Sequence, residues 1–179
     1  METVALDIHR YFDPVLGTRP WRAKPGVGSF LTFEFGKRIK AQGHYHGSWH
    51  LWIYLANWNL FHGDRKLVDS DSDRTLMKAS IRRLEDEVFR EITLNGRRRQ
   101  TIFYFGNFRL EVKPADYLKD ADHRDKYWLF FMPNNEVLSA GPSGFRIERE
   151  KAPRRTEEVR RSYKSTMDSP GRRIVSLEN

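Results

Sequence analysis

The stretch SWHLWIYLANWNLF, residues 48–61, decides the expected fold. In an extended chain, alternate side chains point to opposite faces. Both faces of this stretch are apolar, with Trp49, Leu51, Ile53 and Leu55 on one and Trp52, Tyr54, Ala56, Trp58 and Leu60 on the other. Such a strand is typical of a position that is covered on both sides. The stretch therefore predicts one central strand, which Gly63–Asp64 ends.

Shorter strand patterns lie on either side of this stretch. Leu31, Phe33 and Phe35 alternate with other residues, and Gly36–Lys37 indicates a turn into a second strand near 38–42. Turn residues separate the later segments, near 101–105, 108–113, 126–132, 136–140 and 145–149. The pattern predicts an antiparallel β-meander of about seven to eight strands, forming a sheet or a partly open barrel.

One segment instead has helical periodicity, at spacings of four, three and four: Met77, Ile81, Leu84 and Val88. This spacing places the four side chains on one face of a helix. Ser70 or Ser72 can cap its start, and Asn95–Gly96 supplies a left-handed residue to stop it. We expect an amphipathic α-helix over 73–92, inserted after the third strand, and hence an α+β fold.

Composition divides the chain into three parts. Proline and glycine are frequent in residues 1–28, which predicts an irregular lead-in packed on the domain. Residues 29–150 are expected to form a single β-rich domain, which fits the length of the chain. Apolar residues become sparse from Lys151, so residues 151–179 are expected to form a flexible basic tail.

The bulk composition excludes several classes of protein. The chain of 179 residues is 39% hydrophobic and 31% charged, which is typical of a globular protein. It has no cysteine, so disulfides, thiolate zinc sites and cysteine nucleophiles are excluded. The start lacks the basic and apolar regions of a secretory signal, and residues 49–61 fall short of the about 20 apolar residues of a membrane helix. We therefore expect a cytoplasmic protein with no membrane contact.

Three of the six histidines, His44, His46 and His50, share one strand parity. The outer two would lie about 20 Å apart on a straight strand, too far for one metal ion. We therefore expect no bound metal. If the protein does bind one, His44 and His46 are the expected ligands. No nucleophile-elbow serine motif, zinc-protease histidine motif or P-loop is present, so catalytic residues remain unknown and no cofactor is expected.

Two sets of residues are candidates for binding. Arginine pairs well with phosphate, and the candidate nucleic-acid residues are Arg97, Arg98 and Arg99 of the domain and Arg154, Arg155, Arg160 and Arg161 of the tail. Trp52 and Trp58 share one strand parity and are the candidates for a protein-binding surface. The formal net charge of +8 favours an acidic partner in either case.

The segments GSFLTFEFG at 28–36 and GSWHLWIYLANW at 47–58 resemble a strand pattern of small uncharacterised bacterial proteins. No activity goes with that pattern, but the resemblance implies an immunity or accessory role. We therefore expect a non-catalytic, protein-binding accessory protein of a bacterial cytoplasm. The alternatives are a nucleic-acid-binding protein using Arg97–Arg99 and the tail, and a metal-dependent hydrolase using His44 and His46.

The tail yields a first prediction. A segment with so few apolar residues cannot offset its own ordering entropy, so deleting residues 152–179 is expected to leave the thermal unfolding midpoint nearly unchanged. The same deletion should weaken salt-sensitive binding, because it removes seven of the eight Lys/Arg of the tail and all four of its acids. Thermal unfolding of the full and truncated chains checks this, and a fall of many degrees would make the tail part of the fold.

Overall fold

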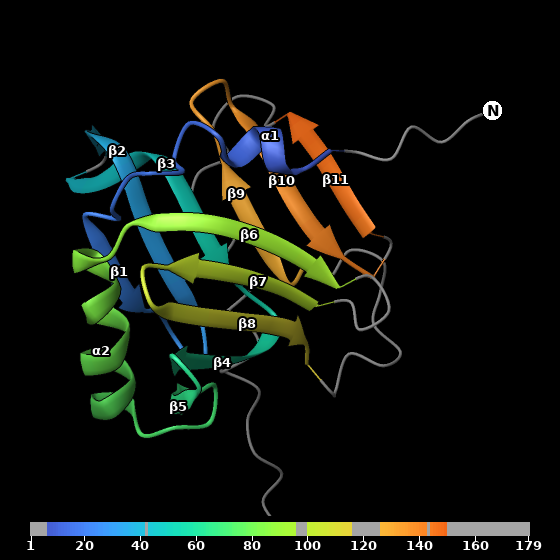
Figure 1. Ribbon diagram of the computed structural model, residues 1–179. Helices are drawn as coiled ribbons and strands as arrows, with labels where there is room; N and C mark the ends of the chain where they lie inside the picture. The colour runs from blue at the N-terminus through green and yellow to red at the C-terminus, as the bar shows by residue number, and fades with distance from the viewer. Residues whose placement is uncertain (1–6, 42, 96–99, 116–125, 143, 150–179) are drawn as a thin grey trace, which may run out of the picture. The chain divides into compact units, whose positions relative to one another are not determined.

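The computed structural model describes residues 7–41, 43–95, 100–115, 126–142 and 144–149, all within the unit formed by residues 1–149 (Figure 1). Sheet A has six antiparallel strands in the order β1-β2-β3-β9-β10-β11: β1 (Arg22–Pro25), β2 (Leu31–Ala41), β3 (His44–Ile53), β9 (Trp128–Phe131), β10 (Glu136–Gly141) and β11 (Gly144–Arg149). Sheet B has five in the order β5-β4-β8-β7-β6: β4 (Ala56–His62), β5 (Arg65–Asp69), β6 (Phe89–Asn95), β7 (Gln100–Phe105) and β8 (Phe108–Pro114).

The prediction of a mostly antiparallel β protein with a helix is confirmed, but the strands form two sheets instead of one meander. In Figure 1 the strands of sheet B run across those of sheet A, and one apolar core lies between the two sheets. No closed barrel is present in the described ranges. Of the strands that the sequence did not predict, β1 and β5 are short, and β6 lies where a helix was expected.

The decisive stretch 48–61 is two strands, so the prediction of one central strand is wrong. β3 belongs to sheet A and β4 to sheet B, and the chain turns between them at Tyr54–Leu55. The N–H of Tyr54 donates to the Tyr127 carbonyl at 2.8 Å, and that of Leu55 donates to the Lys126 carbonyl at 3.1 Å. The corner reverses which parity faces the core: Leu51 and Ile53 are buried in β3, and Ala56, Trp58 and Leu60 in β4.

Gly36 does not form the predicted turn, because β2 runs unbroken through it. The register with β3 shifts between Phe35 and Arg38, where β2 has one residue more than its partner. Gly36 has φ +70°, a left-handed conformation that suits the extra residue of a β-bulge. The N–H of Lys37 then donates to the Ser48 hydroxyl at 3.1 Å, so the displaced backbone group keeps a partner.

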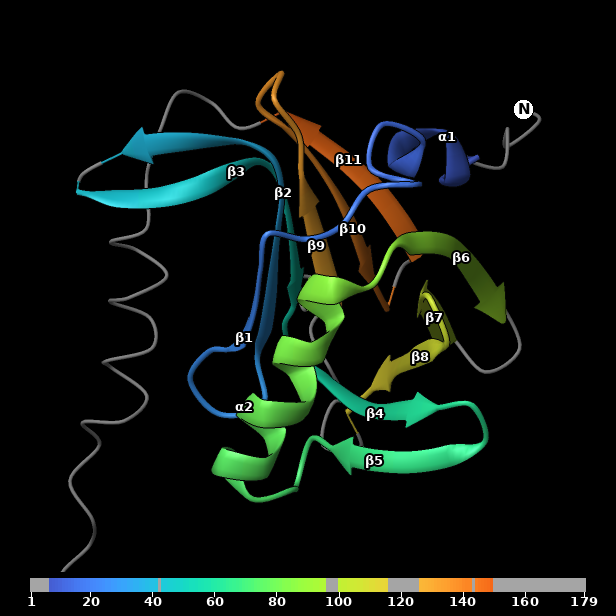
Figure 2. The same ribbon diagram turned by 60° about the vertical axis from the view of Figure 1, so that its left-hand side comes forward.

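The helix begins later than its expected caps and follows β5. α2 (Arg74–Arg82) is capped by Asp73, whose carboxylate accepts the N–H groups of Thr75 and Leu76, and a 3₁₀ turn, η1 (Arg83–Asp86), continues it. The predicted apolar face is confirmed as far as Leu84, since Met77, Ile81 and Leu84 are all buried. α2 packs against β1 and β5, along the side where sheets A and B diverge (Figure 2).

The expected extension of the helix to Ile92 is wrong, because the chain is already extended at Glu87 and enters β6 at Phe89. The N–H of Phe89 donates to the Thr18 carbonyl at 2.8 Å, and the Phe89 carbonyl accepts the N–H of Gly17 at 2.8 Å. Val88 and Ile92 are four residues apart, which fits one helix face but also one strand parity. Pairing with distant segments therefore decides between the two.

The lead-in contains regular structure that its many breakers do not predict. It holds a short helix, α1 (His9–Phe12), and the edge strand β1. Phe12 is fully buried and stacks on Phe130, with ring centroids 4.3 Å apart. It also meets the edges of Phe89, Phe103 and Trp128. The lead-in thus supplies a central aromatic side chain of the core.

Residues 150–179, the expected tail, lie outside the described residues, and the prediction for that segment stays a prediction. No helix in the described part of the chain has the length and apolar composition needed to cross a membrane.

The packing of η1 yields a second prediction. Leu84 has no exposed surface, whereas Leu76 in the same helical segment is 54% exposed. Leu84→Ala is expected to lower the free energy of unfolding by about 2–5 kcal/mol, because it removes buried contacts and leaves a cavity. Leu76→Ala is the matched control and should change it by less than about 0.5 kcal/mol. Urea unfolding measures both, and equal losses would contradict this assignment of faces.

Candidate functional site

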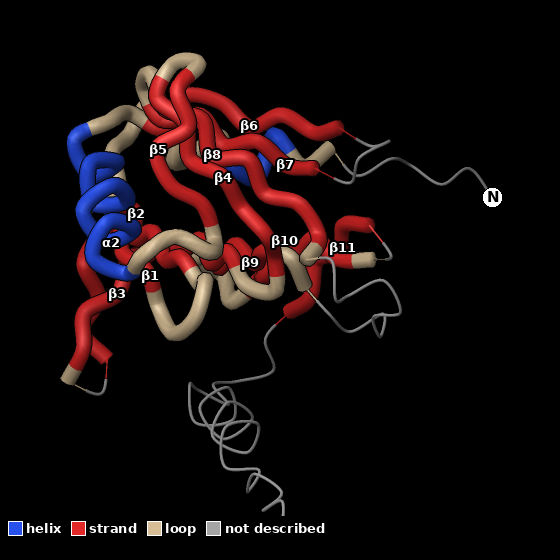
Figure 3. Tube along the Cα trace, turned by 90° about the horizontal axis from the view of Figure 1, so that it is seen from below, coloured by secondary structure: helices blue, strands red, loops and turns tan. Residues whose placement is uncertain are grey.

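The ends of β2 and β3 form a two-stranded arm that projects from sheet A. We define the arm as residues 37–41 and 43–47. β1 pairs with β2 only at Leu31–Glu34, and β9 pairs with β3 only at His50–Ile53. Both outer edges of the arm therefore lack a neighbouring strand among the described residues. Figures 2 and 3 show the arm extending away from the rest of the sheet.

The side chains of the arm are largely exposed, including two large apolar ones. Tyr45 is 50% exposed and Ile39 is 42% exposed. Register pairs Lys40 with Tyr45 and Ile39 with His46, so these pairs lie on opposite faces of the ribbon. Exposed apolar side chains rimmed by polar residues are typical of interaction surfaces.

The arm is also basic and lies in a long stretch of sequence that is poor in acids. Between Asp13 and Asp64 the sequence has a single acid, Glu34, against six Lys/Arg. Three of the six, Lys37, Arg38 and Lys40, are on the arm and exposed. Because Glu34 is only 2% exposed, no carboxylate from this part of the chain offsets the positive charge at the surface.

Glu34 fixes the root of the arm. Its carboxylate accepts the N–H of Gly47 at 2.7 Å and the guanidinium of Arg22 at 3.2 Å. The same Arg22 nitrogen also donates to the carbonyl of Tyr45. Two acceptors from adjacent strands thus share one guanidinium, and the carboxylate ties the strands together where the arm leaves the sheet.

Gly47 is required at this root by close approach. A Cβ there would collide with the backbone of Phe35 and of Trp49, because β2 and β3 come together opposite the bulge. Near the root, two guanidinium groups contact the ring of Trp21, with Arg22 at 4.9 Å and Arg38 at 4.7 Å from its centroid. Cation–π contacts of this kind hold the basic side chains in place.

The electrostatics of the root come from burial. Burial raises the pKa of Glu34, and the Gly47 N–H and Arg22 oppose that rise. Burial, with smaller contributions from the nearby His46 and Arg22, lowers the pKa of His50 to about 3. His50 is therefore neutral at neutral pH, which agrees with its Nε2 accepting the indole N–H of Trp52. The 3.4 Å separation of this Nε2 from Glu34 Oε1 is then no ion pair.

This arrangement suits positioning better than proton transfer. Glu34 is sealed from solvent, its oxygens already accept hydrogen bonds, and the Nε2 of His50 is occupied by Trp52. The other two candidate histidines, His44 and His46, lie on the arm. In the described ranges, no group of three or more His, Asp or Glu side chains is placed to hold a metal ion.

The remaining candidates from the sequence do not meet at one place. Trp52 is half-buried on the outer face of sheet A, beside His50 and Phe131. Trp58 is fully buried in the core instead, and its indole N–H donates to the Ser29 carbonyl at 2.6 Å, so it is not part of a surface. Arg97–Arg99, and Arg154, Arg155, Arg160 and Arg161, lie outside the described residues.

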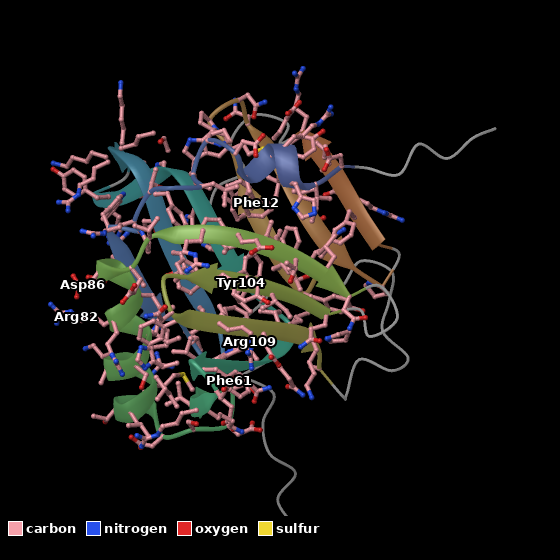
Figure 4. All side chains as sticks on the ribbon, viewed as in Figure 1. Phe12, Phe61, Arg82, Asp86, Tyr104 and Arg109 are labelled. Atoms are coloured by element: carbon pink, nitrogen blue, oxygen red, sulfur yellow. The ribbon has the colours of Figure 1, made fainter. Side chains whose placement is uncertain are left out.

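Two other surface features are less suited to binding. A cavity of about 300 Å³ lies between the sheets near Leu94, Tyr127 and Phe145, and its polar groups are engaged: Gln100 donates to Glu111, and Thr101 accepts from Trp128. On the outer face of sheet B, Phe61, Arg109 and Tyr104 form a cross-strand row (Figure 4). Arg109 is held there by Glu111 at 2.8 Å and by the Phe61 ring at 4.5 Å.

Compared with protein-family models, curated proteins and solved structures, the chain matches none of them. The arm is the site that reasoning from sequence missed. Its signal is the absence of Asp and Glu between Glu34 and Asp64, in a chain where acids are otherwise frequent.

The root of the arm yields a third prediction, on pH. The folded-state pKa of His50, about 3, lies below its ordinary value of 6.5, so the unfolded chain binds a proton that the folded chain does not. The stability that depends on neutral His50 is present above pH 6.5 and is lost as pH falls toward 3. His50→Gln keeps an acceptor for Trp52 but cannot titrate. Both proteins are expected to lose stability between about pH 7 and about pH 4. The free energy of unfolding of His50→Gln should fall by a few kcal/mol less over this range than that of the wild type.

Urea unfolding at the two pH values measures this difference. Glu34 is present in both chains, so its own titration cancels to first order. His44→Gln is the matched control, because His44 is exposed on the arm, and it should follow the wild type. Equal losses in wild type and His50→Gln would mean that His50 is not held neutral by its surroundings.

Proposed function

We propose that the protein is a non-catalytic binding protein that engages an acidic macromolecular partner through the β2–β3 arm. The observation that carries this proposal is the exposed, acid-free ribbon itself. Lys37, Arg38 and Lys40 supply positive charge, and Ile39 and Tyr45 supply contact area. A bacterial, cytoplasmic accessory or immunity-like role, as the strand pattern implies, is compatible with such a protein.

The construction of the root supports a binding role. Holding a basic arm in one direction lowers the entropy lost when a partner binds, which is the general benefit of preorganisation. Glu34, Arg22 and Gly47 provide this rigidity through one carboxylate and one guanidinium. A loose arm of the same composition would carry the same charge but would bind less tightly.

The alternative of a metal-dependent hydrolase has less support. His46 Nδ1 lies 2.9 Å from its neighbouring Gly47 carbonyl, and His44 is exposed near the tip of the arm. The carboxylate at the root of the arm, Glu34, is committed to Gly47 and Arg22. A hydrolytic site needs a carboxylate or imidazole that is free to accept a proton near a bound substrate.

A fourth prediction tests the arm with a generic polyanion. The double variant Lys37→Gln/Lys40→Gln is expected to elute from immobilised heparin at lower salt than the wild type, because two exposed positive charges leave the binding surface. The matched control is Lys78→Gln/Lys113→Gln, which removes two exposed lysines from α2 and β8. The control should elute close to the wild type, and equal shifts for the two variants would overturn the proposed role of the arm.

A further inference from the structure

We infer that the acidic partner is double-stranded DNA and that the arm enters its major groove. This inference rests on the proposed function and names the partner class of the same site. It depends on three features of the described residues: the dimensions of the ribbon, its unpaired edges and the placement of its side chains.

The dimensions of the arm fit one groove. Paired strands lie about 4.8 Å apart, and the segment Lys37–Ala41 extends about 13 Å at 3.3 Å per residue. The major groove of B-form DNA is about 12 Å wide and 8.5 Å deep and admits a two-stranded ribbon, whereas the minor groove is only about 6 Å wide. The major groove of duplex RNA is too deep and narrow to be entered in this way. The ribbon is therefore long enough to reach the base edges of DNA.

The edges of the arm argue against a protein partner that adds a strand. Strand addition requires a flat edge with regularly spaced N–H and C=O groups. The edge of β2 instead carries the Gly36 bulge, and Lys37 and Lys40 follow it. Bulges and edge lysines are the devices by which proteins block pairing between edges. A partner must then be held by side chains, which is how phosphates are bound.

The side chains of the arm divide into the two kinds of contact that DNA needs. Lysine and arginine bind phosphates without regard to sequence, and contacts in the groove read the bases. Lys37 and Lys40 are exposed, and Arg38 is held over Trp21 at 4.7 Å. Tyr45 lies on the same face of the ribbon as Lys40, and its exposed ring and hydroxyl suit contact with base edges.

The burial of Glu34 also favours an anionic partner. Any exposed carboxylate near the arm would repel phosphate, and the only acid between Asp13 and Asp64 is 2% exposed. An acidic protein would also tolerate this surface, because Lys and Arg donate to carboxylates as they do to phosphates. Polyglutamate is therefore included in the test below.

The test is fluorescence anisotropy with the full chain and a labelled mixed-sequence DNA duplex, repeated over a range of salt. Lys37→Gln/Lys40→Gln is expected to lose about ten-fold in affinity and to reduce the slope of log K against log salt by about 2, since each phosphate contact contributes about 0.9. The control Lys78→Gln/Lys113→Gln should keep both the affinity and the slope. Unchanged urea midpoints for both variants show that the comparison concerns binding and not folding.

Three outcomes would overturn the inference. The first is an equal slope of log K against log salt for the arm variant and the control variant. The second is that duplex RNA of the same length binds as tightly as DNA and loses as much affinity in the arm variant. The third is that the arm variant loses binding to polyglutamate but not to DNA. If the arm still governs heparin elution in any of these cases, the proposed function stands and only the partner is wrong. If arm and control variants also behave alike on heparin, the proposed function fails as well.

Discussion

At Tyr54 and Leu55 the backbone leaves one sheet and enters the other, and the carbonyls of Tyr127 and Lys126 receive the two N–H groups exposed by the turn. Buried backbone donors without partners are costly, so this corner forms only where the start of β9 lies beside it. The N–H of Tyr127 donates in turn to the Ala140 carbonyl at 2.7 Å, which links the corner to β10. One pair of residues thereby sets the relative placement of β3, β4, β9 and β10.

The same strand that turns at the corner carries the arm at its other end. β3 is anchored by β9 over His50–Ile53, and it has lost that neighbour where the arm begins. The Glu34 carboxylate holds the strand beyond this point, since it accepts the N–H of Gly47, three residues before His50. The buried Glu34 carboxylate therefore holds the arm rigidly where it leaves the sheet. Its burial also keeps its negative charge away from the surface, where it would weaken the binding of an anion.

Much of the architecture could be predicted from alternation and turn chemistry, and the errors have a common physical origin. The two apolar parities of residues 48–61 fit either a strand covered on both faces or a strand that changes sheet. Only the backbone partners at 126 and 127 distinguish the two. The spacing of Leu84, Val88 and Ile92 likewise fits a helix or a strand, and the pairing of Phe89 with Gly17 and Thr18 settles it. Such contacts connect distant segments and leave no local pattern.

The candidate site shows the same division. The basic residues and the absence of acids near the arm are visible in the sequence, but their exposure is not. Gly36 is equally typical of a turn and of a bulge, and only the register with β3 reveals that the strand continues. The parity that grouped Trp52 with Trp58 is broken by the corner between them, so one remains on a sheet face and the other enters the core.

The stacking of Phe12 on Phe130 has a consequence for synthesis on the ribosome. Chains emerge N-terminal end first, yet this contact joins residues near opposite ends of the described chain, and the β3–β9 pairing also joins segments far apart in the sequence. Contact order is therefore high, and folding should be slow compared with that of a helical protein of similar size. Until β9 is made, the edge of β3 at His50–Ile53 has no partner strand. The local β2–β3 hairpin, with lysines along its edge, is then the part of sheet A best able to form early without recruiting another nascent chain.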